Sequence, residues 1–127
     1  MPEVVLDASA LLALLHAEPG RERVAACLPG ARLSAVNLAE VVGKLAEHGL
    51  SEAEIRGALG GLGLVVVPFE WEHALACGLL RPATRVLGLS LGDRAALGLA
   101  RALGLPILSA DRAWGELPAE WGVELIR

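Results

Sequence analysis

Four acidic residues of this chain stand where predicted strands give way to predicted helices: Asp7, Glu40, Asp93 and Asp111. They include all three aspartates of the 127-residue sequence. In an open parallel sheet, ligands bind in the crevice outside the carboxyl ends of the strands, so we expect the four carboxylates to face one crevice. Two like charges roughly 5 Å apart repel each other by about 3 kcal/mol at an effective dielectric constant of 20. Four converging carboxylates therefore require a cation among them.

The nature of these four residues predicts which cation that is. Carboxylate ligands without a histidine or cysteine cluster select a hard ion such as Mg²⁺ or Mn²⁺. Such ions activate water and neutralise the charge on phosphoryl oxygens. The alternative is that each acid only caps a helix, because aspartate and glutamate are favoured at helix N-termini. Taken singly each residue fits that alternative, and only the four together favour a metal site.

The stretch from Val86 to Trp114 contains two of these acids and predicts a loop, a helix, a loop, a strand and the start of a helix. Ser90 and Asp93 have the spacing of a capping box, so the helix is expected to begin there. Apolar residues follow at helical intervals and Gly104 suits the helix end. Residues 106–109 then form a short apolar strand, and the last aspartate stands just past its carboxyl end.

The rest of the chain alternates strands and helices. The other predicted strands are Glu3–Leu6, Arg32–Ala35, Leu64–Pro68 and, at an edge of the sheet, Val123–Ile126. The other predicted helices are Ala8–His16, Arg21–Leu28, Asn37 to about Glu47 (begun by a second capping-box spacing), one opened by Ser51, and Glu70 to about Leu80. This alternation predicts a single α/β domain, residues 1–127, with a largely parallel sheet.

Composition and charge exclude several classes of protein. The net charge of −4 excludes a domain with an overall basic footprint for nucleic acid. The segment 81–112 nevertheless holds five arginines against two acids. The longest uncharged run, residues 57–69, is too short to span a bilayer, and the acidic N-terminus does not resemble a signal peptide. Two cysteines fit a reducing compartment, so we expect a cytoplasmic protein with no membrane partner.

The apolar residues make up 54% of the chain, which predicts a surface covered by a partner and hence an oligomer. The helix Ala8–His16 is apolar almost all round, so we expect it to be buried or covered by another chain. We predict that the three tryptophans pack in the core or at an interface, with stacking on bases as the alternative: Trp71, Trp114 and Trp121.

Two other acidic α/β families fit less well. A phosphoacceptor receiver domain has an acidic pair after its first strand and a lysine late in the chain. Here Asp7 follows Leu6 without an acidic neighbour, and the lone lysine is Lys44. A phosphatase with an Asp-x-Asp nucleophile motif fails because Ser9 stands where the second aspartate belongs.

Four segments in this order resemble the PIN-domain nucleases over essentially the whole chain: LDASALLALL, NLAEV, GLSLGDRAALGLA and LPILSADRAW. Within that family they are most similar to the VapC-like toxins of toxin–antitoxin pairs. The resemblance implies a three-layer α/β/α sandwich with a mainly parallel sheet of about five strands. It also implies Mg²⁺-dependent endonucleolytic cleavage of RNA, with Mn²⁺ as a substitute, a homodimer, and an antitoxin that covers an apolar groove. The helix Ala8–His16 is a candidate wall of that groove.

The same resemblance assigns roles to residues. It makes the four acids the catalytic metal ligands: Asp7, Glu40 and Asp93 hold the ion, and Asp111 completes the site directly or through water. Ser9 and Ser109 would orient carboxylates or bound water, and Asn37 would be a helix cap with less claim to the site. The arginines nearest to these acids are candidate contacts for the RNA backbone: Arg85, Arg94 and Arg112.

Two alternatives remain within the family. One is a PIN nuclease of RNA processing or decay that has no antitoxin. The other is a non-catalytic PIN scaffold that only binds a partner, although a scaffold gives no reason to keep four mutually repelling carboxylates.

Overall fold

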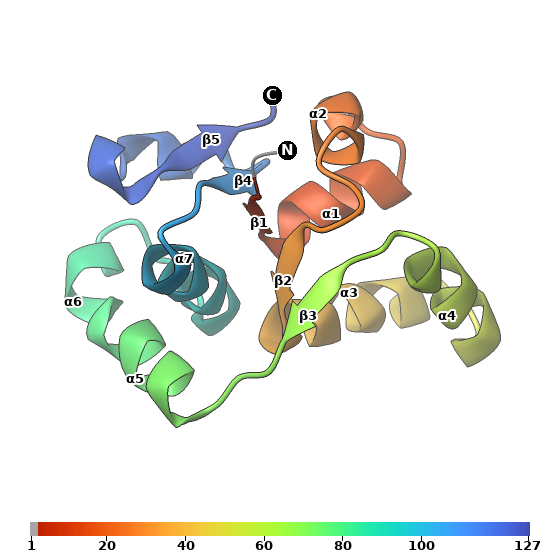
Figure 1. The fold of residues 1–127 in the computed structure, drawn as a ribbon, viewed down its shortest axis with the longest axis horizontal. Helices are drawn as coiled ribbons and strands as arrows, with labels where there is room; N and C mark the ends of the chain where they lie inside the picture. The colour runs from red at the N-terminus through yellow and green to blue at the C-terminus, as the bar shows by residue number, and fades with distance from the viewer. Residues whose placement is uncertain (1–2) are drawn as a thin grey trace.

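A computed structural model describes residues 3–127, so the first two residues of the predicted 1–127 domain lie outside it. Its centre is one sheet of five parallel strands in the order β3-β2-β1-β4-β5 (Figure 1). The strands are β1 (Val5–Leu6), β2 (Arg32–Ser34), β3 (Val65–Val67), β4 (Ile107–Ser109) and β5 (Val123–Leu125). All five coincide with predicted strands, and β5 lies at an edge as expected.

Seven α-helices and two 3₁₀ turns are found in the described part of the chain. They are α1 (Ala8–Leu15), α2 (Arg21–Ala25), α3 (Ala35–Glu47), α4 (Glu52–Gly60), α5 (Trp71–Leu79), α6 (Arg81–Thr84), α7 (Leu91–Leu103), η1 (Arg112–Glu116) and η2 (Ala119–Trp121). Two features differ from the prediction. The second helix stops at Ala25, short of Leu28, which precedes Pro29 and is therefore disfavoured in helical geometry. The short helix α6 was not predicted.

Side chains from β1 and from Val4, the residue before it, point to two separate cores because successive residues of an extended chain face opposite sides of a sheet. Val4 and Leu6 pack with residues of α1, α2, α3 and α4. Val5 packs with residues of α7 and η1 on the other side. Helices therefore cover both faces of the sheet (Figure 1), which confirms the predicted three-layer α/β/α sandwich.

The structure corrects the predicted start of α3. Its N-cap is Ser34, the last residue of β2, whose hydroxyl accepts a hydrogen bond from the Val36 amide (3.2 Å). Asn37 and Glu40 therefore lie inside the helix, and Asn37 is not its cap. Ser34 takes this role because its backbone is still extended while its side chain reaches the first turn. The side chain of Asn37 is thereby left free for another contact.

The predicted ends of α7 are confirmed. The side chain of Ser90 accepts from the Asp93 amide (3.1 Å), and the Asp93 carboxylate accepts from the Ser90 amide (2.9 Å). Gly104 ends the helix in the left-handed conformation, with φ of 66°, which favours glycine. The first turn of α7 and the Asp93 backbone are thus fixed locally.

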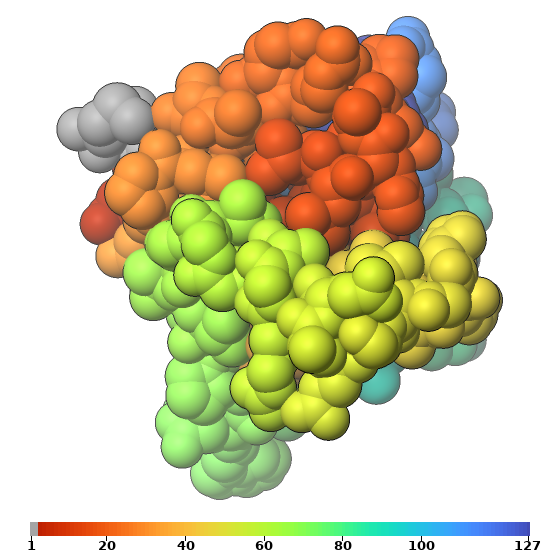
Figure 2. Space-filling view, turned by 90° about the vertical axis from the view of Figure 1, so that its right-hand side faces the viewer, coloured from red at the N-terminus to blue at the C-terminus, as the bar shows by residue number. Residues whose placement is uncertain are grey.

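The helix α1 is partly buried: Ala10, Leu11 and Ala13 lie inside the core, and its other five residues are half-buried. One face of the molecule shows α1 and α2 (orange) above α4 (yellow-green), with the green chain of the β3 region below (Figure 2). Across residues 3–127, we find no helix with the length and apolar character needed to cross a membrane.

Candidate active site at the carboxyl edge of the sheet

Asp7 is a buried carboxylate at the end of the central strand. It follows β1 directly, caps α1 and is only 3% exposed. Its Oδ1 accepts a hydrogen bond from the Ala10 amide at 2.8 Å. The carboxylate is therefore both a helix cap and the most deeply buried acid of the predicted set, so the capping alternative does not account for all of its surroundings.

Two serines hold the Asp7 carboxylate from neighbouring elements. Ser109, at the end of β4, donates to Oδ2 at 2.6 Å and accepts from the Asp111 amide at 3.0 Å. The Ser9 hydroxyl lies 2.8 Å from Asp7 Oδ1 and 2.9 Å from Oδ2, and accepts from the Ala110 amide at 2.9 Å. These bonds tie the carboxyl ends of β1 and β4 together around one carboxylate.

Burial raises the pKa of Asp7 from 3.8 to about 6. Desolvation of the charged form is the largest cause, and hydrogen bonds from Ser109, Ala10 and Ser9 oppose it. The negative charge of Asp93 raises the pKa further, because that carboxylate lies nearby. Asp7 is thus a carboxylate whose charge the protein alone does not fully stabilise.

The Glu40 carboxylate reaches the start of α7, where it lies against Gly92. A Cβ atom built on Gly92 would overlap the Glu40 carboxylate, so that carboxylate occupies the space that the missing side chain leaves. Gly92 immediately precedes Asp93 in the first turn of α7. The glycine therefore lets an acid from α3 reach the start of α7, where the next acid stands.

Asn37 lies closer to the candidate site than the sequence indicated. It is 1% exposed, and its Nδ2 donates to Glu40 Oε1 at 2.8 Å and to the Gly92 carbonyl at 2.9 Å. Its Oδ1 is buried and has no hydrogen-bond partner within the described chain. The available signal was the spacing of three between Asn37 and Glu40, which places both on one side of a helix capped by Ser34.

The two remaining acids are turned toward their own helix starts. Asp93 is half-buried, and its carboxylate accepts a hydrogen bond from the Ser90 amide in the capping box of α7. Asp111 is exposed and caps η1 by accepting from the Ala113 amide at 3.0 Å. Over residues 3–127, no three acidic, histidine or cysteine side chains lie close enough to hold a metal ion. The acids stand near the predicted edge, and within residues 3–127 they do not converge on one point.

The donor set nevertheless fits a hard divalent cation. The groups at the edge are carboxylates and one amide oxygen, which are the ligands that Mg²⁺ and Mn²⁺ prefer. The unpartnered Asn37 Oδ1 lies beside the glycine space that holds Glu40, and Asp7 is a buried carboxylate with a raised pKa. A hydrated cation would give Asn37 Oδ1 a partner and would balance the negative charge of Asp7.

The arginines proposed to contact RNA are placed differently from one another. Arg85 and Arg112 are exposed. Arg94 is 7% exposed, donates from Nη1 to the Cys77 carbonyl at 3.3 Å, and has a buried Nε without a partner. Arg94 is therefore not on the surface, where a contact with the RNA backbone requires it to be, because its side chain points from α7 toward α5.

Comparison with known proteins gives a consistent fold. A sequence profile described as "PIN domain" matches residues 4–120. A toxin–antitoxin complex from Klebsiella pneumoniae has a TM-score of 0.76 at 21% identity and covers 98% of both chains. DNA-bound VapBC from Salmonella typhimurium has a TM-score of 0.73 at 20% identity and covers 100% of both. VapBC-1 from nontypeable Haemophilus influenzae has a TM-score of 0.72 at 18% identity and covers 98% of both. No curated protein matches the chain.

Proposed function

Because this chain belongs to the PIN domain family, we propose that it is a Mg²⁺-dependent endoribonuclease of the cytoplasm and the toxin of a toxin–antitoxin pair. One observation carries the nuclease part of this proposal. The buried Asp7 carboxylate lies at the end of the central strand, near Asp93 in the first turn of α7. Glu40 reaches the start of α7 as well, beside Gly92. Helix capping explains neither the burial of Asp7 nor the position of Glu40.

We assign the metal to Asp7, Glu40 and Asp93, with Asp111 as a ligand directly or through water, and Mn²⁺ as a substitute for Mg²⁺. A divalent ion there supplies water activation and neutralises charge on the phosphoryl oxygens. Ser9 and Ser109 hold the Asp7 carboxylate in one orientation through their hydroxyl donors. No side-chain nucleophile is required for this reaction.

The chain also positions the nucleic acid. The exposed Arg85 and Arg112 are proposed to contact phosphates of the RNA, and Arg94 is not, because its guanidinium is buried. Contacts of this kind fix the backbone without reading sequence. A buried arginine one residue after Asp93 instead holds α7 against α5 through the Cys77 carbonyl.

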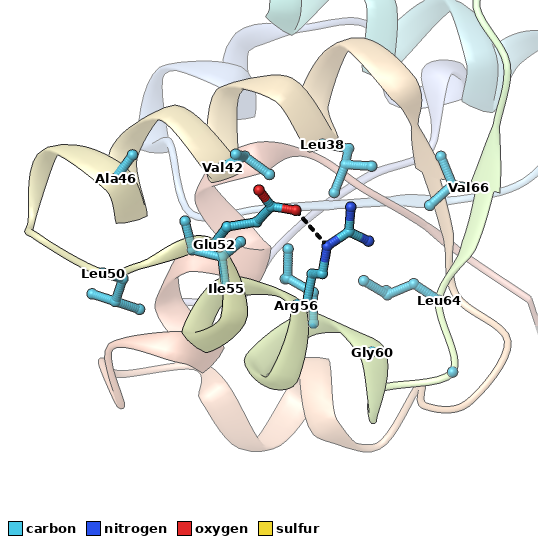
Figure 3. Close-up of a pocket in the computed structure, with 12 residues that line it drawn as sticks. Leu38, Val42, Ala46, Leu50, Glu52, Ile55, Arg56, Gly60, Leu64 and Val66 are labelled. Atoms are coloured by element: carbon cyan, nitrogen blue, oxygen red, sulfur yellow. Dashed lines mark hydrogen bonds and ion pairs between the residues drawn. The ribbon is translucent and has the colours of Figure 1, made fainter.

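The toxin assignment is supported by the solved structures of similar fold, which are toxin–antitoxin complexes. An antitoxin needs a surface, and an apolar groove of about 830 Å³ lies between α3, α4 and β3 (Figure 3). Its lining includes Leu38, Val42, Ile55 and Val66, with the Glu52–Arg56 ion pair beside them. No residue of α1 lines this groove, so α1 as a wall of the antitoxin groove stays a separate prediction. We propose that an apolar segment of the antitoxin binds in it.

The nuclease proposal is tested by mapping new RNA ends after incubating total RNA from the source cell with the protein and Mn²⁺. The Glu40→Gln variant is expected to lose the cleavage because it removes one carboxylate at the site. Glu47→Gln is the matched control, since Glu47 is an exposed acid near the other end of the same helix. Cleavage that survives in Glu40→Gln or in EDTA would contradict the proposed site, and no cleavage together with no Mn²⁺ binding would favour a non-catalytic scaffold.

The antitoxin proposal has a separate test, which uses any small protein encoded immediately upstream. Val66 lines the groove, whereas Val65 is its neighbour in β3, faces the other side of the strand and is equally exposed at 42%. Val66→Asp is expected to weaken binding at least tenfold, and Val65→Asp is expected to leave it unchanged. Equal losses would show that the groove is not the binding surface. The absence of an upstream partner would favour a PIN nuclease of RNA processing or decay.

A further inference from the structure

Two histidines from different helices lie against each other at the surface. His16 ends α1 and His48 ends α3, and both residues are exposed. Their ring centroids are 5.4 Å apart, with an angle of 73° between the ring planes. The two helices pack together and follow the neighbouring parallel strands β1 and β2. The fold thus brings together two imidazoles that stand far apart in the sequence.

The separation of the two rings is the one that a shared metal ion requires. With a zinc–nitrogen bond of about 2.0–2.1 Å, the centre of an imidazole ring lies about 3.2 Å from the ion. Two such rings at a tetrahedral angle therefore have centroids about 5.3 Å apart. The observed separation of 5.4 Å matches this value. Packing of aromatic rings alone would allow any separation from roughly 4.5 to 7 Å.

The ring of His48 is held in the tautomer that a metal ligand needs. Its Nδ1 lies 2.9 Å from the carbonyl oxygen of Lys44. A carbonyl oxygen can only accept, so in the neutral ring Nδ1 carries the hydrogen and Nε2 keeps its lone pair. Metal-binding histidines almost always donate from their other nitrogen in this way, often to a backbone carbonyl. The hydrogen bond to Lys44 therefore leaves Nε2 of an exposed ring available to a metal ion.

The helix ends around the two rings also favour a cation. Each histidine is the C-cap of its helix, and a helix C-terminus carries a partial charge of about −0.5 from its last carbonyls. The last turn of α1 holds no basic side chain, and that of α3 holds only Lys44. A divalent ion between the rings would thus be stabilised by two helix C-termini as well as by two imidazoles.

We propose that His16 and His48 together bind one divalent transition-metal ion, such as Zn²⁺, Ni²⁺ or Cu²⁺, across the C-terminal ends of α1 and α3. Imidazole nitrogen suits these ions, whereas carboxylate oxygen suits Mg²⁺ and Mn²⁺, so the site differs chemically from the acidic edge of the sheet. No third acidic, histidine or cysteine side chain of the described chain joins the pair, so water completes the coordination. The ion would hold together the helix that Asp7 caps and the helix that carries Glu40.

The first test is calorimetric titration of the full chain with Zn²⁺ in excess Mg²⁺, which occupies the carboxylates. We expect wild type to bind one Zn²⁺ at this site, and His16→Gln and His48→Gln each to lower the affinity at least tenfold, because a single imidazole cannot chelate. His73→Gln is the matched control, since His73 is the one other histidine of the chain and lies in α5. Its Zn²⁺ affinity should equal that of wild type.

The second test counts the nitrogen ligands by electron paramagnetic resonance of the protein loaded with one equivalent of Cu²⁺. The hyperfine pattern should report two imidazole nitrogens in wild type and in His73→Gln, and one in His16→Gln. The two cysteines are buried and do not compete for the ion. Because the wild-type spectrum is informative by itself, this test does not depend on the folding of any variant, which circular dichroism checks.

Three results would each overturn the proposal. They are a wild-type chain that binds no Zn²⁺ in excess Mg²⁺, binding that survives when both histidines are replaced by glutamine, and an equal loss of affinity in His73→Gln. Two independent sites, with the number of bound ions falling from two to one in each single variant, would also contradict a shared ion. None of these measurements uses RNA, so the nuclease proposal stands or falls separately.

Discussion

The side chain of Asn37 donates a hydrogen bond to the backbone carbonyl of Gly92, 55 residues later in the chain, at 2.9 Å. The same amide nitrogen donates to Glu40 at 2.8 Å. One buried amide thus joins the first turns of α3 and α7 and orients an acid between them. The position of the Glu40 carboxylate therefore depends on Asn37, which is not itself an acid.

Asn37→Ala is expected to lower both stability and metal affinity. The change leaves the Gly92 carbonyl and Glu40 without their buried donor, at a cost of about 1–3 kcal/mol in the free energy of unfolding. Urea denaturation and Mn²⁺ titration calorimetry measure the two effects. Ala39→Ser, on the exposed side of the same turn, is the control and is expected to change neither. Unchanged Mn²⁺ affinity in Asn37→Ala would show that this amide does not support the site.

Gly92→Ala is expected to separate folding from function. The added methyl group overlaps the Glu40 carboxylate, which is the mobile end of an exposed side chain and can move away. The fold is therefore retained while Mn²⁺ affinity and cleavage fall at least tenfold. Gly57→Ala is the matched control, because it lies within α4 and its new methyl group meets nothing within 4 Å. We expect Gly57→Ala to stabilise the protein by about 0.4–1 kcal/mol without changing Mn²⁺ binding.

The metal-free protein is expected to lose stability as the pH rises. The pKa of Asp7 is about 6 in the folded protein and 3.8 in its unperturbed state, so the folded protein binds this proton more tightly. The stabilising contribution is complete below pH 3.8 and is lost as the pH rises through 6. Asp7→Asn, which keeps the helix cap, should therefore be more stable than wild type in EDTA at pH 8, by up to about 3 kcal/mol.

Thermal unfolding of the two proteins between pH 4 and pH 8 tests this difference. Near pH 4 their stabilities should approach each other, because most of the Asp7 carboxyls are then protonated in the folded state. Addition of Mn²⁺ at pH 8 should stabilise wild type and leave Asp7→Asn nearly unchanged. A constant difference across this pH range would mean that Asp7 is not the group responsible.

Ser109→Ala is expected to weaken Mn²⁺ binding by about 10–100-fold, the usual loss when a group that orients a metal ligand is removed. The variant loses the 2.6 Å hydrogen bond to Asp7 Oδ2, which holds the carboxylate and lowers its pKa. Ser51→Ala removes a helix cap of α4 away from the site and serves as the control. It should lose about 1 kcal/mol of stability with no change in Mn²⁺ affinity. Similar affinities in the two variants would contradict the role given to Ser109.

Sequence reasoning located the strands, most helix boundaries and the edge at which the acids gather. These features depend on local signals: short apolar runs for β1 and β4, the Ser90–Asp93 capping box, and Gly104 at the end of α7. It failed at the start of α3. Both Ser34 and Asn37 are residue types that cap helices, and Ser34 is the cap because β2 ends there. It also missed α6, a single turn that has no periodicity of its own.

The sequence by itself therefore determined the fold class and the placement of Asp7, Asp93 and Asp111 at helix starts, because propensity and periodicity act over a few residues. The tertiary structure alone decided which side chains meet. The Ser109–Asp7 bond spans 102 residues, and the space that Gly92 leaves for Glu40 exists only where α3 packs against α7. Contacts of this kind depend on how elements pack, and no local pattern specifies that packing.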